Sequence, residues 1–181
     1  MVITETKLKD CFILEPKVFN DSRGYFFESF NQRKFYNLTG HQVNFIQDNE
    51  TFSTKGVLRG LHFQTGEFAQ AKLVRVIKGR VLDIAVDLRK NSETFGEFQS
   101  LELSEDNKKQ FFIPRGFAHG FVVLSDTAIF TYKCDNYYNK ESEAGIIYND
   151  STLNINWLLQ EQELILSDKD KILPTFEIYF K

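Results

Sequence analysis

In the stretch Leu82-Asp-Ile-Ala-Val-Asp-Leu88, apolar residues occupy every second position. A period of two is typical of a β-strand, whose successive side chains point to opposite faces of a sheet. The residues from Leu73 to Ile77 follow the same pattern, and Gly79 lies between the two segments. The sequence therefore predicts a β-hairpin that turns at residues 78–80.

Short apolar segments separated by turn residues recur along the rest of the chain. We expect strands at residues 111–113, 121–124 and 128–132, a helix at residues 29–38 ended by Gly40, and a second helical piece near residues 158–164. The intervals between strands are too short for the crossover helices that a parallel sheet requires. The sequence predicts a mainly β fold, a barrel or jelly roll with a few short helices.

The composition fits one globular domain over residues 1–181. The chain is 42% hydrophobic, which is enough for a substantial core at this length. A net charge of -3 provides no basic field, so we expect no nucleic-acid partner. Because no apolar run approaches membrane-spanning length and no signal peptide is recognisable, we expect a cytoplasmic protein with no membrane partner. Cys11 and Cys134 suggest neither a disulfide framework nor a metal site.

Two of the three histidines lie in the segments Arg59-Gly-Leu-His62-Phe-Gln64 and Pro114-Arg-Gly-Phe-Ala-His119-Gly-Phe121. His62 is close in sequence to two cations, Arg59 and Lys72. A base beside fixed positive charge suits removal of a proton next to a carbonyl on an anionic substrate. The alternative is that both histidines are hydrogen-bonded polar residues of a β core.

Strand parity groups these polar residues with small or apolar ones, as expected for the lining of a barrel mouth. The groups that share a face are Leu58, Gly60, His62 and Gln64; Lys72, Val74 and Val76; and Ala128, Phe130 and Tyr132. Arg59 has the opposite parity to His62. Either the strand is bulged there, or Arg59 contacts a different part of the ligand.

The motif Pro114-x-Gly116-x-x-His119 resembles the second sequence motif of the cupins. Metal-binding cupins usually supply further ligands through a His-x-His pair and a following Glu. Here His62-Phe63-Gln64 breaks that pair, and two histidines without a clustered carboxylate make a poor transition-metal site. We therefore expect no metal and no other cofactor.

Nearly the whole chain resembles the dTDP-4-dehydrorhamnose 3,5-epimerases, which have a cupin-like jelly-roll fold. The matching segments appear in order and at the spacing of the family. They run from residues 15–19 to 166–170 and include Asp21-Ser-Arg-Gly-Tyr-Phe-Phe-Glu28, Gln47-Asp-Asn49, Gly56-Val-Leu-Arg-Gly-Leu-His62, Ala69-Gln-Ala-Lys72-Leu-Val, Phe117-Ala-His119-Gly-Phe, Tyr132-Lys-Cys-Asp-Asn-Tyr-Tyr138 and Glu143-Ala-Gly-Ile. Together they predict a cupin-like jelly-roll β-barrel.

The resemblance implies an activity and four catalytic residues. The activity is epimerisation at C3 and C5 of dTDP-4-dehydro-6-deoxy-D-glucose, in the deoxysugar biosynthesis that supplies rhamnose to cell-surface polysaccharides. His62 would be the base that removes the proton beside the 4-keto group, with Asp170 orienting it. Tyr132 would be the acid on the other face of the sugar ring, and Lys72 would stabilise the enolate oxygen.

The resemblance also implies binding residues and a homodimer. Arg23 and Arg59 would contact the pyrophosphate, and Tyr138 would stack on the thymine. N-terminal strands exchanged between subunits would bring Phe19, Arg23 and Phe26 to the partner's pocket. The other matching positions are Glu28, Gln47, Asn49, His119, Glu143 and Lys169. Without the resemblance, Arg23 could be simple turn chemistry, and Glu143 and Lys169 could be solvated charges.

Three departures from the family pattern leave the substrate and the number of inverted centres open: Arg115, Tyr148 and Leu158. One alternative is a single-centre epimerase or a ketoisomerase on a related nucleotide sugar. Another is a non-catalytic cupin-like binding domain. Retention of Tyr132 favours epimerisation over ketoisomerisation, and retention of His62, Tyr132 and Lys72 together favours an enzyme.

Overall fold

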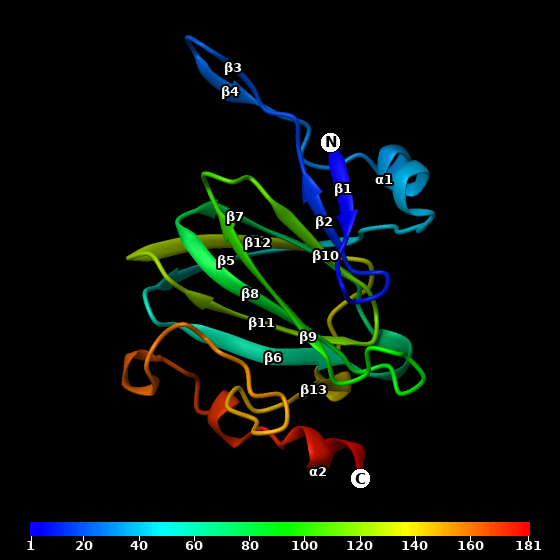
Figure 1. The fold of residues 1–181 in the computed structure, drawn as a ribbon, viewed down its shortest axis with the longest axis vertical. Helices are drawn as coiled ribbons and strands as arrows, with labels where there is room; N and C mark the ends of the chain where they lie inside the picture. The colour runs from blue at the N-terminus through cyan, green and yellow to red at the C-terminus, as the bar shows by residue number, and fades with distance from the viewer.

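The computed structural model describes residues 1–181, and two antiparallel sheets form its body (Figure 1). In spatial order, the six-stranded sheet contains β1 (Val2–Glu5), β2 (Phe12–Glu15), β10 (Gln110–Ile113), β7 (Lys72–Lys78), β12 (Thr127–Cys134) and β5 (Gln47–Thr54). The five-stranded sheet contains β13 (Glu143–Gly145), β6 (Leu58–Gln64), β11 (Phe117–Val123), β8 (Arg80–Asp87) and β9 (Phe98–Ser104). The predicted mainly β jelly roll is confirmed, as two facing sheets rather than a closed barrel.

The two sheets enclose one core, and residues 146–181 pack on the outside of the five-stranded sheet to form a second. Between the sheets, Val74 and Phe130 of the six-stranded sheet pack with Val81 and Phe121 of the five-stranded sheet. The outer face of the five-stranded sheet is covered by the segment after β13, seen as the orange and red layer in Figure 1. This segment contributes the buried side chains Ile146, Tyr148, Leu153, Trp157 and Phe176.

Strand β8 is buried on both faces because it lies between these two cores. Its apolar residues Leu82, Ile84 and Val86 pack outward under the C-terminal segment. Val81 and Ala85 pack inward between the sheets. The alternation predicted from the sequence is confirmed as a strand, but its larger apolar side chains face the outer core.

The expected hairpin at residues 78–80 is wrong. Strands β7 and β8 are not paired; β7 pairs with β10 and β12, whereas β8 pairs with β11 and β9. Gly79 carries the chain from one sheet to the other at a φ of +80°, and a Cβ there would lie 2.1 Å from the carbonyl oxygen of Thr127. Alternation predicted each strand but not the sheet in which it pairs.

The helices are few and short. Helix α1 (Gln32–Thr39) begins three residues later than predicted, because Asn31 accepts a hydrogen bond from the Lys34 amide as N-cap; it ends at Gly40 in the left-handed conformation. The second helix expected near residues 158–164 is wrong. That region holds only the 3₁₀ turn η3 (Glu161–Glu163), and Leu158 has a φ of 63°. The other short helices are η1 (Gly66–Phe68), η2 (Lys140–Ser142), η4 (Asp170–Ile172) and α2 (Phe176–Phe180).

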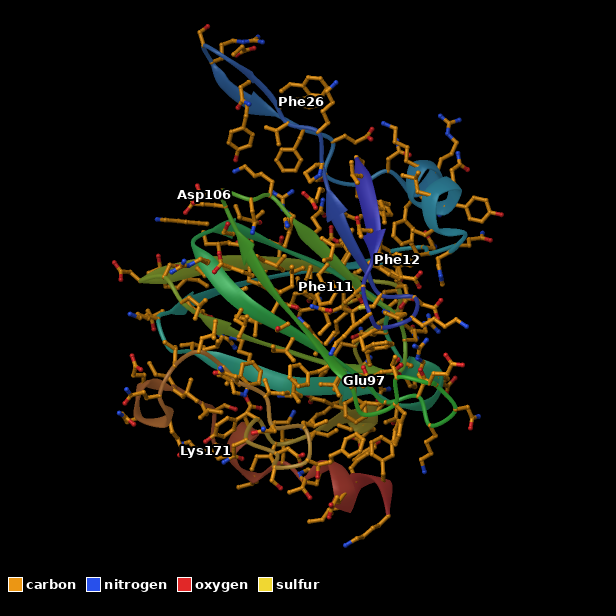
Figure 2. All side chains as sticks on the ribbon, in the orientation of Figure 1. Phe12, Phe26, Glu97, Asp106, Phe111 and Lys171 are labelled. Carbon is orange, nitrogen blue, oxygen red and sulfur yellow. The ribbon has the colours of Figure 1, made fainter.

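A small hairpin stands clear of the body. It consists of β3 (Phe19–Asp21) and β4 (Gly24–Phe26), and all six of its strand residues are exposed. Figures 1 and 2 show it projecting away from both sheets, with Phe26 on one of its arms. The other predicted strands, at residues 111–113, 121–124 and 128–132, are confirmed by β10, β11 and β12. No helix has both the length and the apolar character needed to cross a membrane.

Candidate active site

A cavity of about 560 Å³ opens between the two sheets, and all four predicted catalytic residues line it. The six-stranded sheet contributes Lys72 and Tyr132, and the five-stranded sheet contributes His62 and His119. The segment before η4 closes the remaining side. The full lining is Thr51, Val57, Leu58, Arg59, His62, Lys72, His119, Phe121, Phe130, Tyr132, Glu143, Ile165, Leu166, Ser167, Lys169 and Asp170.

His62 is held by Asp170, a residue 108 positions away in sequence. The two side chains meet at 2.6 Å between His62 Nε2 and Asp170 Oδ1, and Asp170 is only 4% exposed. Burial alone would raise the pKa of Asp170, but the hydrogen bond and charge of His62, the Ser167 hydroxyl and the Gly60 amide together hold that pKa below its ordinary value. Because the carboxylate can only accept, it fixes the proton of neutral His62 on Nε2 and leaves Nδ1 with a lone pair.

A β-bulge places Arg59 and His62 in the same cavity. In the β6–β11 pair, His62 lies opposite His119 and Arg59 lies opposite Phe121, so Gly60 and Leu61 together face a single residue of β11. Parity does not hold through residues 58–64, and of the two alternatives for Arg59 the structure has the bulge. Gly60 is required at this point, because a Cβ there would lie 2.5 Å from the Cα of Gly120.

Lys72 and Tyr132 lie on the opposite wall, on inward faces as their parity predicts. The Lys72 ammonium is 5.9 Å from the centre of the Tyr132 ring. Burial lowers the pKa of Lys72, partly offset by Cys134, Asp83 and Glu143. Burial raises the pKa of Tyr132, as do Cys134 and Glu143, while Arg59 opposes them.

A second histidine–carboxylate pair lies in the five-stranded sheet. His119 Nε2 is 3.1 and 2.9 Å from the two carboxylate oxygens of Asp83, which is fully buried. Sequence reasoning missed Asp83. The available signal was a charged residue at inward parity in a strand whose neighbours are apolar.

The cavity mouth carries a chain of polar contacts among predicted binding residues. The carboxylate of Glu143 is 2.5 Å from the Lys169 ammonium and accepts a hydrogen bond of 2.9 Å from the Tyr138 hydroxyl. The Tyr138 amide donates to the side chain of Gln47. Gln47 in turn donates to Asn49, which lies beside Tyr132 in a neighbouring pocket. Tyr138 is 55% exposed, which leaves its ring available for stacking.

Four predicted binding residues lie away from the cavity of their own chain. Phe19, Arg23 and Phe26 are on the projecting hairpin, where Arg23 pairs with Asp21 at 2.6 Å. Glu28 pairs with Lys34 at the start of α1. No intrachain contact brings any of the four to His62.

The metal-ligating residue types are dispersed. No group of three or more His, Cys, Asp or Glu side chains converges to hold a metal ion. Cys11 and Cys134 are both buried and both free. Metal independence stays a prediction to be tested by assay.

Comparison with known proteins identifies the family of this chain. Residues 5–177 match the sequence model of the dTDP-4-dehydrorhamnose 3,5-epimerases. The chain belongs to this family. It is 54% identical to the dTDP-4-dehydrorhamnose 3,5-epimerase of Escherichia coli K12, over 98% of this chain and 95% of that one. The family assignment makes the chain an epimerase of dTDP-rhamnose biosynthesis, as the resemblance implied.

Two solved structures extend the match to three dimensions. The crystal structure of the Elizabethkingia anophelis enzyme is 59% identical, with a TM-score of 0.96 over 98% of this chain and 97% of that one. A Legionella pneumophila dTDP-6-deoxy-D-glucose-3,5-epimerase, solved in complex with dTDP-4-keto-L-rhamnose, is 48% identical with a TM-score of 0.93, over 98% and 93% of the two chains. Both are similar over almost the whole chain, so the assignment covers the body and the cavity together.

Proposed function

We propose that this chain inverts C3 and C5 of dTDP-4-dehydro-6-deoxy-D-glucose to give dTDP-4-dehydro-L-rhamnose, with His62 as base and Tyr132 as acid. The observation that carries the proposal is the placement of these two groups. His62 comes from the five-stranded sheet and Tyr132 from the six-stranded sheet, and both line one cavity. Inversion requires a proton to leave one face of the carbon and return on the other, so a base and an acid on opposite walls suit the reaction.

Each inversion passes through an enolate. His62 Nδ1 takes the proton from the carbon beside the ketone, and the electron pair of that C–H bond moves toward the carbonyl oxygen. The Lys72 ammonium stabilises the resulting oxyanion, for which one well-placed donor contributes about 3 kcal/mol. Tyr132 then protonates the carbon from the opposite face. The raised pKa of Tyr132 keeps the phenol protonated before this step. Exchange with solvent removes the proton from His62 and returns one to Tyr132, which restores both groups for the second inversion.

The remaining predicted residues would hold the nucleotide. Arg59 has no carboxylate partner in the chain, which leaves its guanidinium free for a diphosphate. Tyr138 and the contacts around Glu143 would bind the thymidine side. We also propose that the whole chain acts as one domain, as a cytoplasmic homodimer in which each projecting hairpin carries Phe19, Arg23 and Phe26 to the partner's cavity.

Product identification tests the proposed activity directly. The chain is incubated with dTDP-4-dehydro-6-deoxy-D-glucose, the product is trapped by reduction of the ketone, and the sugar is identified by NMR. Inversion at both C3 and C5 is the expected result. One inverted centre would indicate a mono-epimerase, and unchanged sugar bound with high affinity would indicate a binding domain.

A further inference from the structure

Asp83 is a buried carboxylate, and the groups around it must offset the free energy lost when its charge is removed from water. It lies on the inward face of β8 between Val81 and Ala85, within the apolar core that the two sheets enclose. Its side chain is fully buried, and His119 Nε2 is its only hydrogen-bond partner. A carboxylate in such surroundings destabilises the fold unless it is paired. Its presence here therefore calls for an explanation beyond packing.

The partner of Asp83 belongs to the cavity wall. His119 lines the cavity, and its backbone lies directly opposite His62 across the β6–β11 pair. The His119 ring is stacked on the Phe130 ring, with 6.1 Å between the ring centres and an interplanar angle of 20°. Its Nδ1 makes no hydrogen bond within the chain. Because Asp83 accepts from Nε2, the ring is fixed with Nδ1 as the nitrogen left for a ligand.

The charges of the cavity divide into pairs and two unpaired cations. His62 pairs with Asp170, Lys169 pairs with Glu143, and His119 pairs with Asp83. Lys72 and Arg59 line the same cavity without a carboxylate contact. A desolvated ammonium without an offsetting charge tends to lose its proton.

We propose that Asp83 is a positioning residue of this site: its buried carboxylate fixes the ring of His119 in the cavity wall and offsets the positive charge of the unpaired ammonium of Lys72. This inference rests on the proposed function. Asp83 does not line the cavity, so it acts through His119, which it contacts, and through the effect of its charge on Lys72. The enolate oxygen that forms beside Lys72 is then stabilised by a charged ammonium, and the His119 ring beside it is held in a fixed orientation.

The charged neighbours of Lys72 define how the role can be measured. Burial lowers its pKa, whereas Cys134 from β12, Asp83 from β8 and Glu143 from β13 raise it. Tyr132, its other titratable neighbour, has a raised pKa, a shift opposite in direction to that of Lys72. Removing the Asp83 charge lowers the pKa of Lys72 further. The alkaline limb of kcat should then move to lower pH.

The test compares Asp83→Asn with Asp87→Asn. Asp87 is an equally buried carboxylate on the same face of the same strand, but its partners are Arg89, Ser92 and Thr94, outside the cavity. We expect Asp83→Asn to lower kcat by about 10–100-fold, the range found when the hydrogen-bond partner that orients a metal-ligating histidine is removed, with dTDP affinity little changed and the alkaline limb shifted. Asp87→Asn should keep the wild-type kcat and pH profile in its folded fraction.

Three results would overturn the inference: a wild-type kcat in Asp83→Asn, an unmoved alkaline limb, or an equal kinetic loss in Asp87→Asn. If Asp83→Asn does not fold, Asp83→Asn/His119→Gln is compared with His119→Gln, because facing amides leave no buried charge. The same shift of the alkaline limb is expected, and its absence also contradicts the role of Asp83. Turnover by the wild type is the check on the proposed function, since an inert wild type would disprove that function and not the placement of Asp83.

Discussion

His62 illustrates how one hydrogen bond can select the reactive atom of a residue. Asp170 binds Nε2 at 2.6 Å, so the lone pair of the neutral ring lies on Nδ1. We expect His62→Asn to lower turnover by at least about 10²–10⁴-fold, the contribution of a general base. Affinity for dTDP, measured by calorimetry, should be unchanged, because dTDP lacks the sugar carbons on which His62 acts.

Arg59→Ala provides the contrast for that measurement. Its guanidinium is the neighbouring free cation, and its loss should weaken dTDP binding as well as turnover. Near wild-type turnover in His62→Asn would make His62 a structural residue and disprove the mechanism.

At the scale of elements, the loop after β8 is held by a charge network that sequence patterns do not reveal. The buried Asp87 carboxylate accepts from Arg89, Ser92 and Thr94, and Arg89 also pairs with Asp10. Burial would raise the pKa of Asp87, but these donors hold it below its ordinary value. We expect Asp87→Asn to reduce the free energy of unfolding at pH 7 by about 2 kcal/mol, the contribution of hydrogen bonds to a charged group.

The pH dependence of that loss follows from the direction of the shift. A carboxyl with a lowered pKa in the folded state stabilises the fold above its unfolded pKa, and this stabilisation is lost as the pH falls through the folded value. Urea unfolding at pH 7 and at about pH 3 should therefore show the gap between wild type and Asp87→Asn narrowing in acid. A gap that is constant with pH would mean that the charge of Asp87 contributes nothing.

The strands could be predicted from the sequence, whereas their pairing could not. Alternation at residues 82–88 identifies β8 because it reports burial, but burial on one face does not say which core provides it. The turn at Gly79 reads like a hairpin because the sequence does not reveal that its two arms enter different sheets. The expected helix at residues 158–164 fails because tertiary packing of the C-terminal segment outweighs local helical spacing.

Site residues could be predicted where a sequence motif or a regular strand identified them, but not where only the three-dimensional fold brings them together. The pairing of His62 with Asp170 came only from the family resemblance, because the 108 intervening positions give no local signal. Parity placed Lys72 and Tyr132 correctly on regular strands. At Arg59 parity left two alternatives open, and the structure has the bulge, which shifts the phase of the strand without a composition signal beyond Gly60.

The projecting hairpin β3–β4 allows the proposed strand exchange to be tested by complementation. One variant, His62→Asn, lacks the catalytic base but keeps an intact hairpin. The other, Arg23→Ala with Phe26→Ala, has an altered hairpin but keeps His62. If each hairpin serves the partner's cavity, a mixed dimer has one site with an intact body and an intact hairpin. Co-refolding equal amounts of the two inactive variants should restore about a quarter of wild-type activity, because half of the dimers are mixed and each has one intact site. Activity that remains absent in purified mixed dimers would contradict the exchange.

At the scale of the whole molecule, the chemistry is expected to need no metal. The dispersed His, Cys, Asp and Glu residues motivate this prediction. Prolonged treatment with a chelator, followed by assay in metal-free buffer, should leave turnover unchanged. Loss of activity that one divalent ion restores would disprove metal independence.

The full reaction is best followed through the protons that it exchanges. In heavy water, each epimerised carbon loses its original proton to His62 and receives one from Tyr132, which has equilibrated with solvent. Because His62 and Tyr132 lie on opposite walls of one cavity, a sugar ring between them presents both carbons beside the ketone to the same pair. We therefore expect deuterium at both C3 and C5 when the product is trapped by a reductase and analysed by mass spectrometry and NMR. The matched control is Tyr132→Phe, which keeps the base but lacks the acid, and which should exchange protons without inverting the carbon. Label at a single carbon with one inverted centre would show a mono-epimerase, in which the ring presents only one of its two acidic carbons to His62.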